Sequence, residues 1–165
     1  TVLDAEKGAY YAPITALDFA SLYPSIMRAH NMCYSTLVRS PSYDRLPGIT
    51  YESFEVDGKI HTFAQNVPSL LPVILNDLVV FRNQAKADKK KAKTNEMKNI
   101  YEGKQLAYKV SMNSVYGFTG AGFAMLPAPE IASSVTCKGR LMIEETKKCV
   151  EANFPGAKVR YGDTD

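Results

Sequence analysis

The sequence LLPVILNDLVVF, residues 70–81, decides the fold because its apolar residues recur every three or four positions. This spacing places them on one face of an amphipathic helix. A lysine-rich run follows at residues 86–93, Thr94-Asn95 interrupts the pattern, and a second helical pattern continues through residues 100–116. Two helical segments joined by so short a break predict an antiparallel helical hairpin.

A third amphipathic helix is predicted beyond the hairpin, over Glu130 to Asn153, where Pro155-Gly156 stops it. We expect this helix to pack against the core, and we expect Phe118 and Phe123, near the preceding glycines, to be core residues as well. The predicted inward stripe of the helix consists of Ala132, Val135, Gly139, Met142 and Cys149.

Shorter elements are predicted on both sides of these helices. Residues 11–18 resemble a buried strand, which turns at Ser21-Leu22-Tyr23-Pro24 into a short helix running toward Asn31, with Pro24 in its first position. An Asp-Gly turn at residues 57–58 closes a β-hairpin. Residues 157–161 alternate as a strand does, and the turn-rich sequence Gly-Asp-Thr-Asp follows at 162–165.

Composition indicates an ordinary folded protein. The chain has 165 residues, of which 45% are hydrophobic and 22% charged, and its net charge of +3 is compatible with a nucleic-acid partner but does not identify one. Its three cysteines lack the spacing of a zinc site or a disulfide framework, which favours a reducing compartment. Residues 70–81 are too short for a membrane span, which needs about 20 apolar residues. We interpret His30 and His61 as structural or surface residues without partners.

Several cations of the hairpin share helix faces. Arg82 and Lys86 are four residues apart, and Lys109, Asn113 and Tyr116 follow at helical spacing on the second helix. If the chain reverses near Thr94-Asn95, residue 82 lies level with about residue 107, within one turn of Lys109. Three converging cations would suit a polyanion such as a triphosphate.

Charge pattern alone favours a simpler alternative, in which Arg82, Lys86 and Lys109 lie on solvated helix faces. The remaining lysines of the hairpin are interpreted as a solvated tip with at most weak attraction for nucleic-acid phosphates. These are Lys89, Lys90, Lys91 and Lys93.

Three aspartates are candidate metal ligands. Asp18 is predicted at the end of a strand, beside a turn rich in backbone N–H groups, and Asp163 and Asp165 flank one residue at the other end of the chain. Taken singly, such residues are more often helix caps or solvated turns. Together, their hard oxygen ligands suit Mg²⁺, and two such ions opposite a cluster of cations suit phosphoryl or nucleotidyl transfer.

Three motifs make the chain recognisable. DFASLYPSI at 18–26, KVSMNSVYGFTG at 109–120 and YGDTD at 161–165 resemble, in order and spacing, the polymerase motifs of family B DNA-dependent DNA polymerases. The resemblance covers nearly the whole chain and is greatest to the delta-type enzymes and their relatives in large DNA viruses, such as those that infect algae. Since the chain does not begin with Met, we expect it to be part of a longer protein.

The resemblance implies an α+β fold, in which an antiparallel palm sheet carries an inserted fingers helical hairpin. Residues 1–67 would form an N-terminal palm segment with an inserted loop and hairpin, residues 68–118 the fingers, and residues 119–165 a truncated C-terminal palm segment. The catalytic acids Asp18, Asp163 and Asp165 would lie together on the sheet.

The resemblance also implies the roles of individual residues. Asp18 and Asp165 would be the main ligands of two Mg²⁺ ions, with Asp163 beside them. Tyr23 would exclude a ribose 2′-hydroxyl, and Tyr116 and Gly117 would lie near the nascent base pair. The residues implied to bind the deoxynucleoside triphosphate (dNTP) are Phe19, Ala20, Ser21, Leu22, Tyr23, Arg82, Lys86, Lys109 and Asn113.

The implied reaction is attack of a primer 3′-hydroxyl on a dNTP, with Lys109 hydrogen-bonding or protonating the leaving pyrophosphate. The implied partners are primer-template DNA, a dNTP and a sliding clamp bound by other parts of the parent protein, with no membrane. The implied location is the nucleus or a viral replication site. We expect the chain alone to be inactive.

Two other functions are compatible with parts of the sequence. One is an RNA-templated or RNA-making polymerase, against which the SLYPS context of Tyr23 argues. The other is a non-enzymatic nucleic-acid-binding module, in which the lysine-rich hairpin contacts phosphates and the acids only cap turns.

Overall fold

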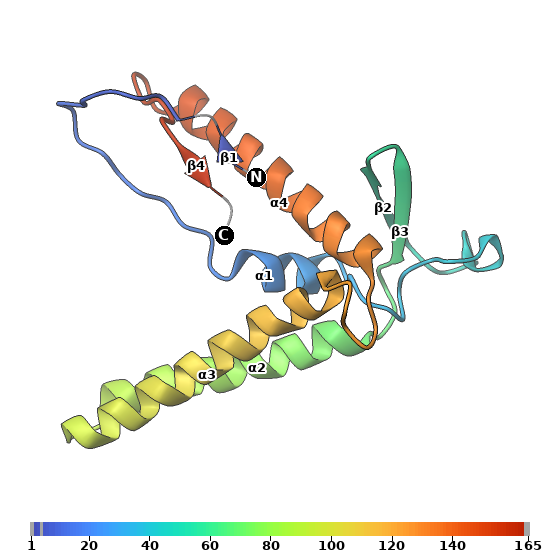
Figure 1. Cartoon of the computed structure of the whole chain (residues 1–165), viewed down its shortest axis with the longest axis horizontal. Helices are drawn as coiled ribbons and strands as arrows, with labels where there is room; N and C mark the ends of the chain where they lie inside the picture. Colours follow the sequence, from blue (N-terminus) through green and yellow to red (C-terminus); the bar gives the residue numbers. More distant parts are fainter. Residues whose placement is uncertain (1, 4, 164–165) are drawn as a thin grey trace.

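The computed structural model describes residues 2–3 and 5–163 and contains four helices that surround a small core, with two separate antiparallel sheets (Figure 1). The fold is therefore a mixture of helix and antiparallel sheet, as expected. The described elements, in chain order, are β1 (Val2–Leu3), α1 (Leu22–Ala29), a 3₁₀ turn (Pro41–Tyr43), β2 (Tyr51–Val56), β3 (Lys59–Ala64), α2 (Leu70–Lys91), α3 (Asn95–Gly120), α4 (Pro129–Asn153) and β4 (Gly162–Asp163).

The predicted helical hairpin is confirmed, and its two helices project together from the rest of the molecule (Figure 1). The Thr94 hydroxyl caps α3 by accepting a hydrogen bond of 3.3 Å from the backbone N–H of Met97, which explains why the second helix begins there. The rings of Phe81 and Tyr108 lie 5.8 Å apart across the hairpin. The register is therefore the one that a reversal near Thr94-Asn95 predicts.

The predicted third helix is also confirmed, as α4, which ends just before Pro155-Gly156. Val135 and Gly139 are buried as expected, and Met142 is half-buried. The prediction for Cys149 is wrong, because its side chain is exposed near the C-terminal end of α4.

The β-hairpin is confirmed, with β2 paired to β3 from Tyr51–Ala64 to Val56–Lys59. Asp57 and Gly58 both have positive φ angles, of 50° and 72°. This is the backbone of a type I′ turn, whose twist matches that of the flanking strands.

Two predicted strands are wrong. Residues 11–18 are irregular, and Tyr11 and Leu17 are exposed, by 97% and 72%. Residues 157–161 are irregular as well. A strand forms only where a neighbouring strand shares its backbone hydrogen bonds. Within the described residues no strand lies beside residues 11–18, and the N-terminal segment makes only one backbone hydrogen bond to residues 157–161, from the Glu6 N–H to the Arg160 carbonyl oxygen.

The predicted turn at Gly162-Asp163 is a short strand instead. Gly162 and Asp163 form β4, which pairs with β1 in the register Val2–Asp163 and Leu3–Gly162. Thr164 and Asp165, the rest of the predicted turn, lie outside the described residues. The sheet expected to carry all three aspartates is thus reduced here to a two-stranded sheet that carries Asp163, while Asp18 lies in the irregular segment.

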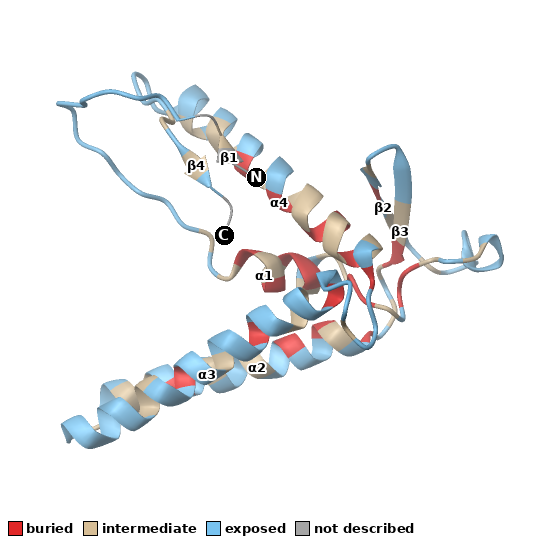
Figure 2. Cartoon of the chain, viewed as in Figure 1, coloured by how far each residue is buried: buried red, intermediate tan, exposed pale blue. Residues whose placement is uncertain are grey.

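The core lies where α1 and α4 meet the adjoining ends of α2 and α3, whereas the far end of the hairpin and the segment before α1 are mostly exposed (Figure 2). The core residues are Leu22, Ile26, Met27, Met32, Leu37, Phe54, Phe63, Leu75, Met112, Ala128, Ile131 and Val135. Phe118 and Phe123 are exposed, by 43% and 105%, so their predicted place in the core is wrong. Within the described residues, no helix is both long and apolar enough to cross a bilayer.

Helix α1 begins at Leu22, so Pro24 is its third residue rather than its first, a position whose N–H also lacks an intrahelical acceptor.

Polar side chains join α1 and the residues after it to the β-hairpin and to α2. The Asn31 amide donates hydrogen bonds to the carbonyl oxygens of Ala64, at 2.8 Å, and Val67, at 2.9 Å. His30 also has a partner, since its Nδ1 lies 2.8 Å from Glu52 Oε2, contrary to the prediction.

Candidate nucleotidyl-transfer site

The segment from Asp18 to Tyr23 turns sharply into α1. Ser21 has left-handed backbone angles, φ 54° and ψ 60°, and its carbonyl oxygen accepts the backbone N–H of Ser25 at 3.0 Å. The Ser25 hydroxyl donates to the carbonyl oxygen of Ala20 at 2.9 Å and fixes the same turn. The first N–H groups of α1 have no intrahelical acceptor, so this turn suits phosphate oxygens.

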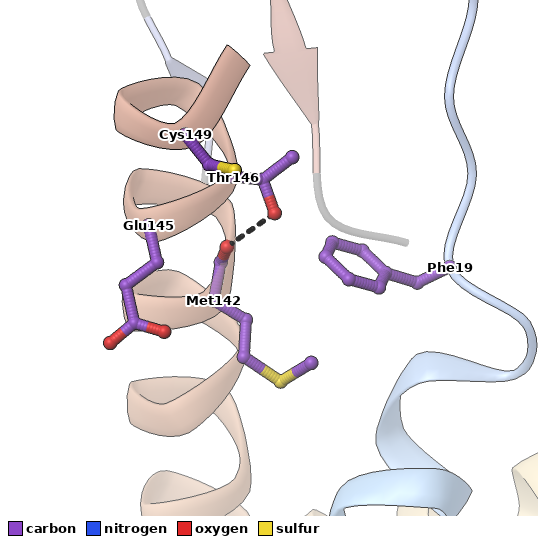
Figure 3. Close-up of a pocket in the computed structure, with 5 residues that line it drawn as sticks. All are labelled: Phe19, Met142, Glu145, Thr146 and Cys149. Carbon is purple, nitrogen blue, oxygen red and sulfur yellow. Dashed lines mark hydrogen bonds between the residues drawn. The ribbon is translucent and has the colours of Figure 1, made fainter. Parts of the chain in front are cut away.

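Phe19 ties this segment to α4. Its ring points across a cavity of about 230 Å³ toward Met142 and Thr146, and Glu145 and Cys149 complete the lining (Figure 3). Asp18 immediately precedes Phe19, and its side chain is exposed. The Asp18–Phe19 segment therefore faces the part of α4 that carries Met142 and Thr146.

Strand β4 brings Asp163 to the same part of α4. Gly162 packs so closely that a Cβ there would lie 2.9 Å from Leu3 Cδ1 and 3.6 Å from Ile143 Cγ2 of α4. The Tyr161 hydroxyl donates a hydrogen bond of 3.0 Å to Asp163 Oδ2. Phe19, next to Asp18, thus lines a cavity with Met142, and Gly162, next to Asp163, lies beside Ile143, the following residue of α4.

The donor set fits a hard cation in its chemistry. Asp18 and Asp163 are both exposed carboxylates on segments that face the same part of α4, and magnesium prefers such oxygen ligands. Among residues 2–3 and 5–163, no three His, Cys, Asp or Glu side chains gather into a metal-binding group. Asp165, the third predicted ligand, lies outside this range.

Of the three predicted cations, Arg82 reaches the turn before α1. Its Nη1 lies 3.3 Å from the Ser21 hydroxyl, and its Nε donates to Gln105 Oε1, also at 3.3 Å. Lys86 and Lys109 are exposed on α2 and α3, as is Asn113. The fold thus connects Arg82 directly to residues 18–23, while Lys86 and Lys109 remain accessible from solvent.

Tyr23 and Tyr116 come together from distant parts of the chain. Their ring centroids are 4.4 Å apart, at an interplanar angle of 32°. Burial raises the pKa of the Tyr116 hydroxyl, with a smaller effect of Tyr23 in the same direction. The Tyr116 hydroxyl is therefore neutral at physiological pH. Gly117, next to Tyr116, is exposed, whereas Leu22 belongs to the core.

Gln105 was not predicted as a site residue, although it contacts Arg82 and is only 7% exposed. Its position four residues before Lys109 places both on neighbouring turns of α3, and this spacing is the only sign of it in the sequence. The burial of this amide within the helical hairpin is identified only when the packing is known.

The fold is similar to that of a solved polymerase. The family B DNA polymerase from the hyperthermophilic archaeon Pyrobaculum calidifontis matches 90% of this chain with a TM-score of 0.71 and 30% sequence identity, over 19% of that polymerase chain. The fold and the arrangement of residues around α4 therefore define part of a DNA polymerase.

Sequence comparisons give the family. The model of DNA polymerase family B matches residues 1–165. The chain is 48% identical to the DNA polymerase of Paramecium bursaria Chlorella virus NY2A and 51% identical to the DNA polymerase delta catalytic subunit of Glycine max, in both cases over 100% of its own length. It spans 19% and 16% of those two proteins. The chain belongs to DNA polymerase family B, which confirms the family indicated by its three motifs.

Proposed function

We propose that the full-length polymerase carrying this chain performs template-directed DNA synthesis in replication. It transfers a deoxynucleoside monophosphate from a dNTP to a primer 3′-hydroxyl and releases pyrophosphate. The observation that carries the proposal is that the Asp18 and Asp163 segments face the same part of α4, with Phe19 lining a cavity beside Met142 and Gly162 lying beside Ile143, in a chain that belongs to family B over its whole length.

In this proposal, residues 1–67 and 119–165 are parts of the palm and residues 68–118 are the fingers. The projecting α2–α3 hairpin supports this division, because it contacts the rest of the chain mainly at one end (Figure 1). If such an element moves relative to α1 and α4, the change in packing is confined to that end.

Asp18, Asp163 and Asp165 would hold two Mg²⁺ ions. When bound, the ions would lower the pKa of the primer hydroxyl and shield the negative charge that develops at the reacting phosphorus. The exposed carboxylates of Asp18 and Asp163 support these roles, since a buried acid could not reach substrate oxygens.

The triphosphate would lie between the turn at residues 19–23 and the hairpin. Backbone N–H groups of the turn would bind its oxygens, and Arg82, Lys86 and Lys109 would pair with the outer phosphates. Asn113 would support the arrangement from α3. Lys109 would also donate a hydrogen bond or a proton to the leaving pyrophosphate, which requires the solvent access that it has.

The sugar and base would lie against the tyrosine pair. Tyr23 would lie under the deoxyribose and leave no room for a 2′-hydroxyl, while Tyr116 and Gly117 would border the nascent base pair. The 4.4 Å separation of the two rings supports a rigid wall at this place, because each ring restricts the rotation of the other.

The partners in this proposal are primer-template DNA and a dNTP, with a sliding clamp bound by other parts of the polymerase. Because sequence choice comes from base pairing, the protein would contact mainly the backbone and shape of the duplex. The proposed place of action is the nucleus or a viral replication site.

Replacing Asp18 by Asn tests the proposal in the full-length polymerase that carries this chain. We expect the rate of dNTP incorporation to fall by about a thousandfold or more, because a neutral amide is a poor magnesium ligand. Primer extension with Mg²⁺ measures the rate, and Asp77→Asn, an exposed position on α2, is the matched control.

An Asp18→Asn polymerase with unchanged incorporation would contradict the catalytic role of this acid. A protein that binds DNA without metal-dependent incorporation, in the substituted and unsubstituted forms alike, would favour the non-enzymatic binding module.

A further inference from the structure

A chain of polar contacts runs across the α2–α3 hairpin to the turn before α1. Lys89 Nζ donates to Glu102 Oε2 at 2.8 Å, near the far end of the hairpin. Closer to the core, Gln105 Oε1 accepts the Nε–H of Arg82 at 3.3 Å, and Arg82 Nη1 donates to the Ser21 hydroxyl at 3.3 Å. The contacts thus connect three segments that are distant in the sequence.

The orientation of the Gln105 amide is set by Arg82. The guanidinium can only donate, so the amide oxygen of Gln105, and not its nitrogen, must face it. The pKa of the Glu102 carboxyl is lowered chiefly by the hydrogen bond from Lys89, and the hydrogen bond from Gln105 adds to this effect. Gln105 is the most buried of these side chains, with 7% exposure.

A hydrogen bond to Nε determines the direction of the whole Arg82 side chain. The guanidinium is planar, so an acceptor at Nε fixes its plane and the directions of its Nη donors. Of these, Nη1 meets Ser21, whose left-handed backbone forms the turn that we propose as the triphosphate site. Ser21 Oγ therefore occupies a position where an incoming phosphate oxygen could replace it.

We propose that Gln105 is a positioning residue, which holds the Arg82 guanidinium toward the turn at Ser21 so that it is oriented for the triphosphate before the nucleotide arrives. The inference rests on the proposed function and extends it to a buried residue outside the three motifs. A side chain that is already ordered loses less conformational entropy on binding, so Gln105 strengthens nucleotide binding without contacting the nucleotide.

The test is Gln105→Leu in the full-length polymerase, a change that keeps the size of the side chain and removes its acceptor. We expect the KM for dNTP to rise by about tenfold, while kcat stays within about threefold, because the lost interaction stabilises the bound substrate and the transition state alike. The matched control is Gln84→Leu on the exposed part of α2, for which we expect less than a twofold change.

A double-substitution cycle separates positioning from a general structural effect. In an Arg82→Ala background, Gln105→Leu should change the KM by less than about twofold, since its effect passes through the missing guanidinium. An equal rise in KM with and without Arg82 would overturn the inference, and so would an unchanged KM in the single variant. If Gln105→Leu does not fold, Gln105→Met is judged by the same outcomes.

A measurement without catalysis distinguishes this inference from the proposed function. The ¹⁵N-labelled Nε–H of Arg82 should exchange slowly with water in the unsubstituted polymerase and faster in Gln105→Leu. Gln105-dependent protection without any nucleotide incorporation would contradict the proposed function alone. Incorporation with identical exchange and identical KM in both forms would contradict the positioning role alone.

Discussion

At the scale of single residues, the contact between Tyr23 and Tyr116 connects two motifs that lie far apart in the chain. The ring of Tyr23 lies against that of Tyr116 and near Gly139 of α4, with 3.5 Å from its Cε1 to a Cβ built at Gly139. A ring confined in this way is a hard obstacle, because it cannot rotate aside to admit a larger sugar.

We expect Tyr23→Ala to relax the choice of sugar in the full-length polymerase. Removing the ring opens space for a 2′-hydroxyl, so the preference for dNTP over NTP should fall by about tenfold to a hundredfold. The ratio of kcat/KM for the two substrates measures it. Tyr116→Phe, which keeps the supporting ring, should leave the ratio within about twofold, and an unchanged ratio in Tyr23→Ala would refute the steric role.

At the scale of secondary-structure elements, the crossing of α1 and α4 positions Tyr23. Gly139 is buried at this crossing, where a built Cβ would lie 3.5–3.6 Å from side-chain atoms of Tyr23, Ile26 and Leu22. These distances are ordinary van der Waals contacts, so the crossing has room for a methyl group and for nothing larger.

Two substitutions at Gly139 should therefore have opposite effects. Gly139→Ala should stabilise the fold by about 0.5–1 kcal/mol, because alanine loses less backbone entropy in a helix. Gly139→Leu should cost about 1–3 kcal/mol, because its extra atoms push α1 and Tyr23 away from α4. Urea unfolding measures both. A leucine variant as stable as the alanine variant would show that the crossing is looser than described.

At the scale of the whole molecule, the first and last described segments are tied together by side chains. The Glu6 carboxylate pairs with both Lys158 and Arg160, and the backbone N–H of Glu6 donates to the carbonyl oxygen of Arg160 at 3.0 Å. Arg160 also lies 4.8 Å from the centre of the Tyr10 ring. These contacts, together with the pairing of β1 and β4, bring Asp163 beside the N-terminal segment.

This connection should weaken in acid. Hydrogen bonds from Lys158 and Arg160 lower the pKa of Glu6 below its ordinary value of 4.5. The stabilisation is therefore fully present above that ordinary value and is lost as the pH falls through the lower, folded-state pKa. We expect the hydrogen-exchange protection factor of the Glu6 amide to decrease in this range. Glu6→Gln should show low protection at every pH, and protection that is independent of pH in the unsubstituted protein would contradict the role of the carboxylate.

We expect the 165-residue chain alone to be inactive in primer extension. Asp18 lies in an irregular, exposed segment that has no strand beside it in the described part of the chain, so its carboxylate is not held relative to Asp163. A metal site needs fixed ligand geometry. Primer extension with Mg²⁺ by the chain alone, compared with the full-length polymerase, measures this, and templated incorporation by the chain alone would contradict it.

The sequence by itself determined the elements whose stability is local. The α2–α3 hairpin, α4 and the turn at Asp57-Gly58 follow from apolar periodicity, a threonine cap and two residues that tolerate positive φ. The three motifs also sufficed to identify the family, because their order and spacing are specific.

Only the tertiary structure decided the interactions between distant segments. The strand predicted over residues 11–18 did not form, since a strand depends on a partner that no local pattern specifies. The contacts of Arg82 with Gln105 and Ser21, and the packing of Phe19 and Gly162 on α4, likewise could not be predicted. The physical reason is the same in each case: periodicity fixes which side of an element is apolar, whereas the identity of the opposing side chain depends on how the elements pack.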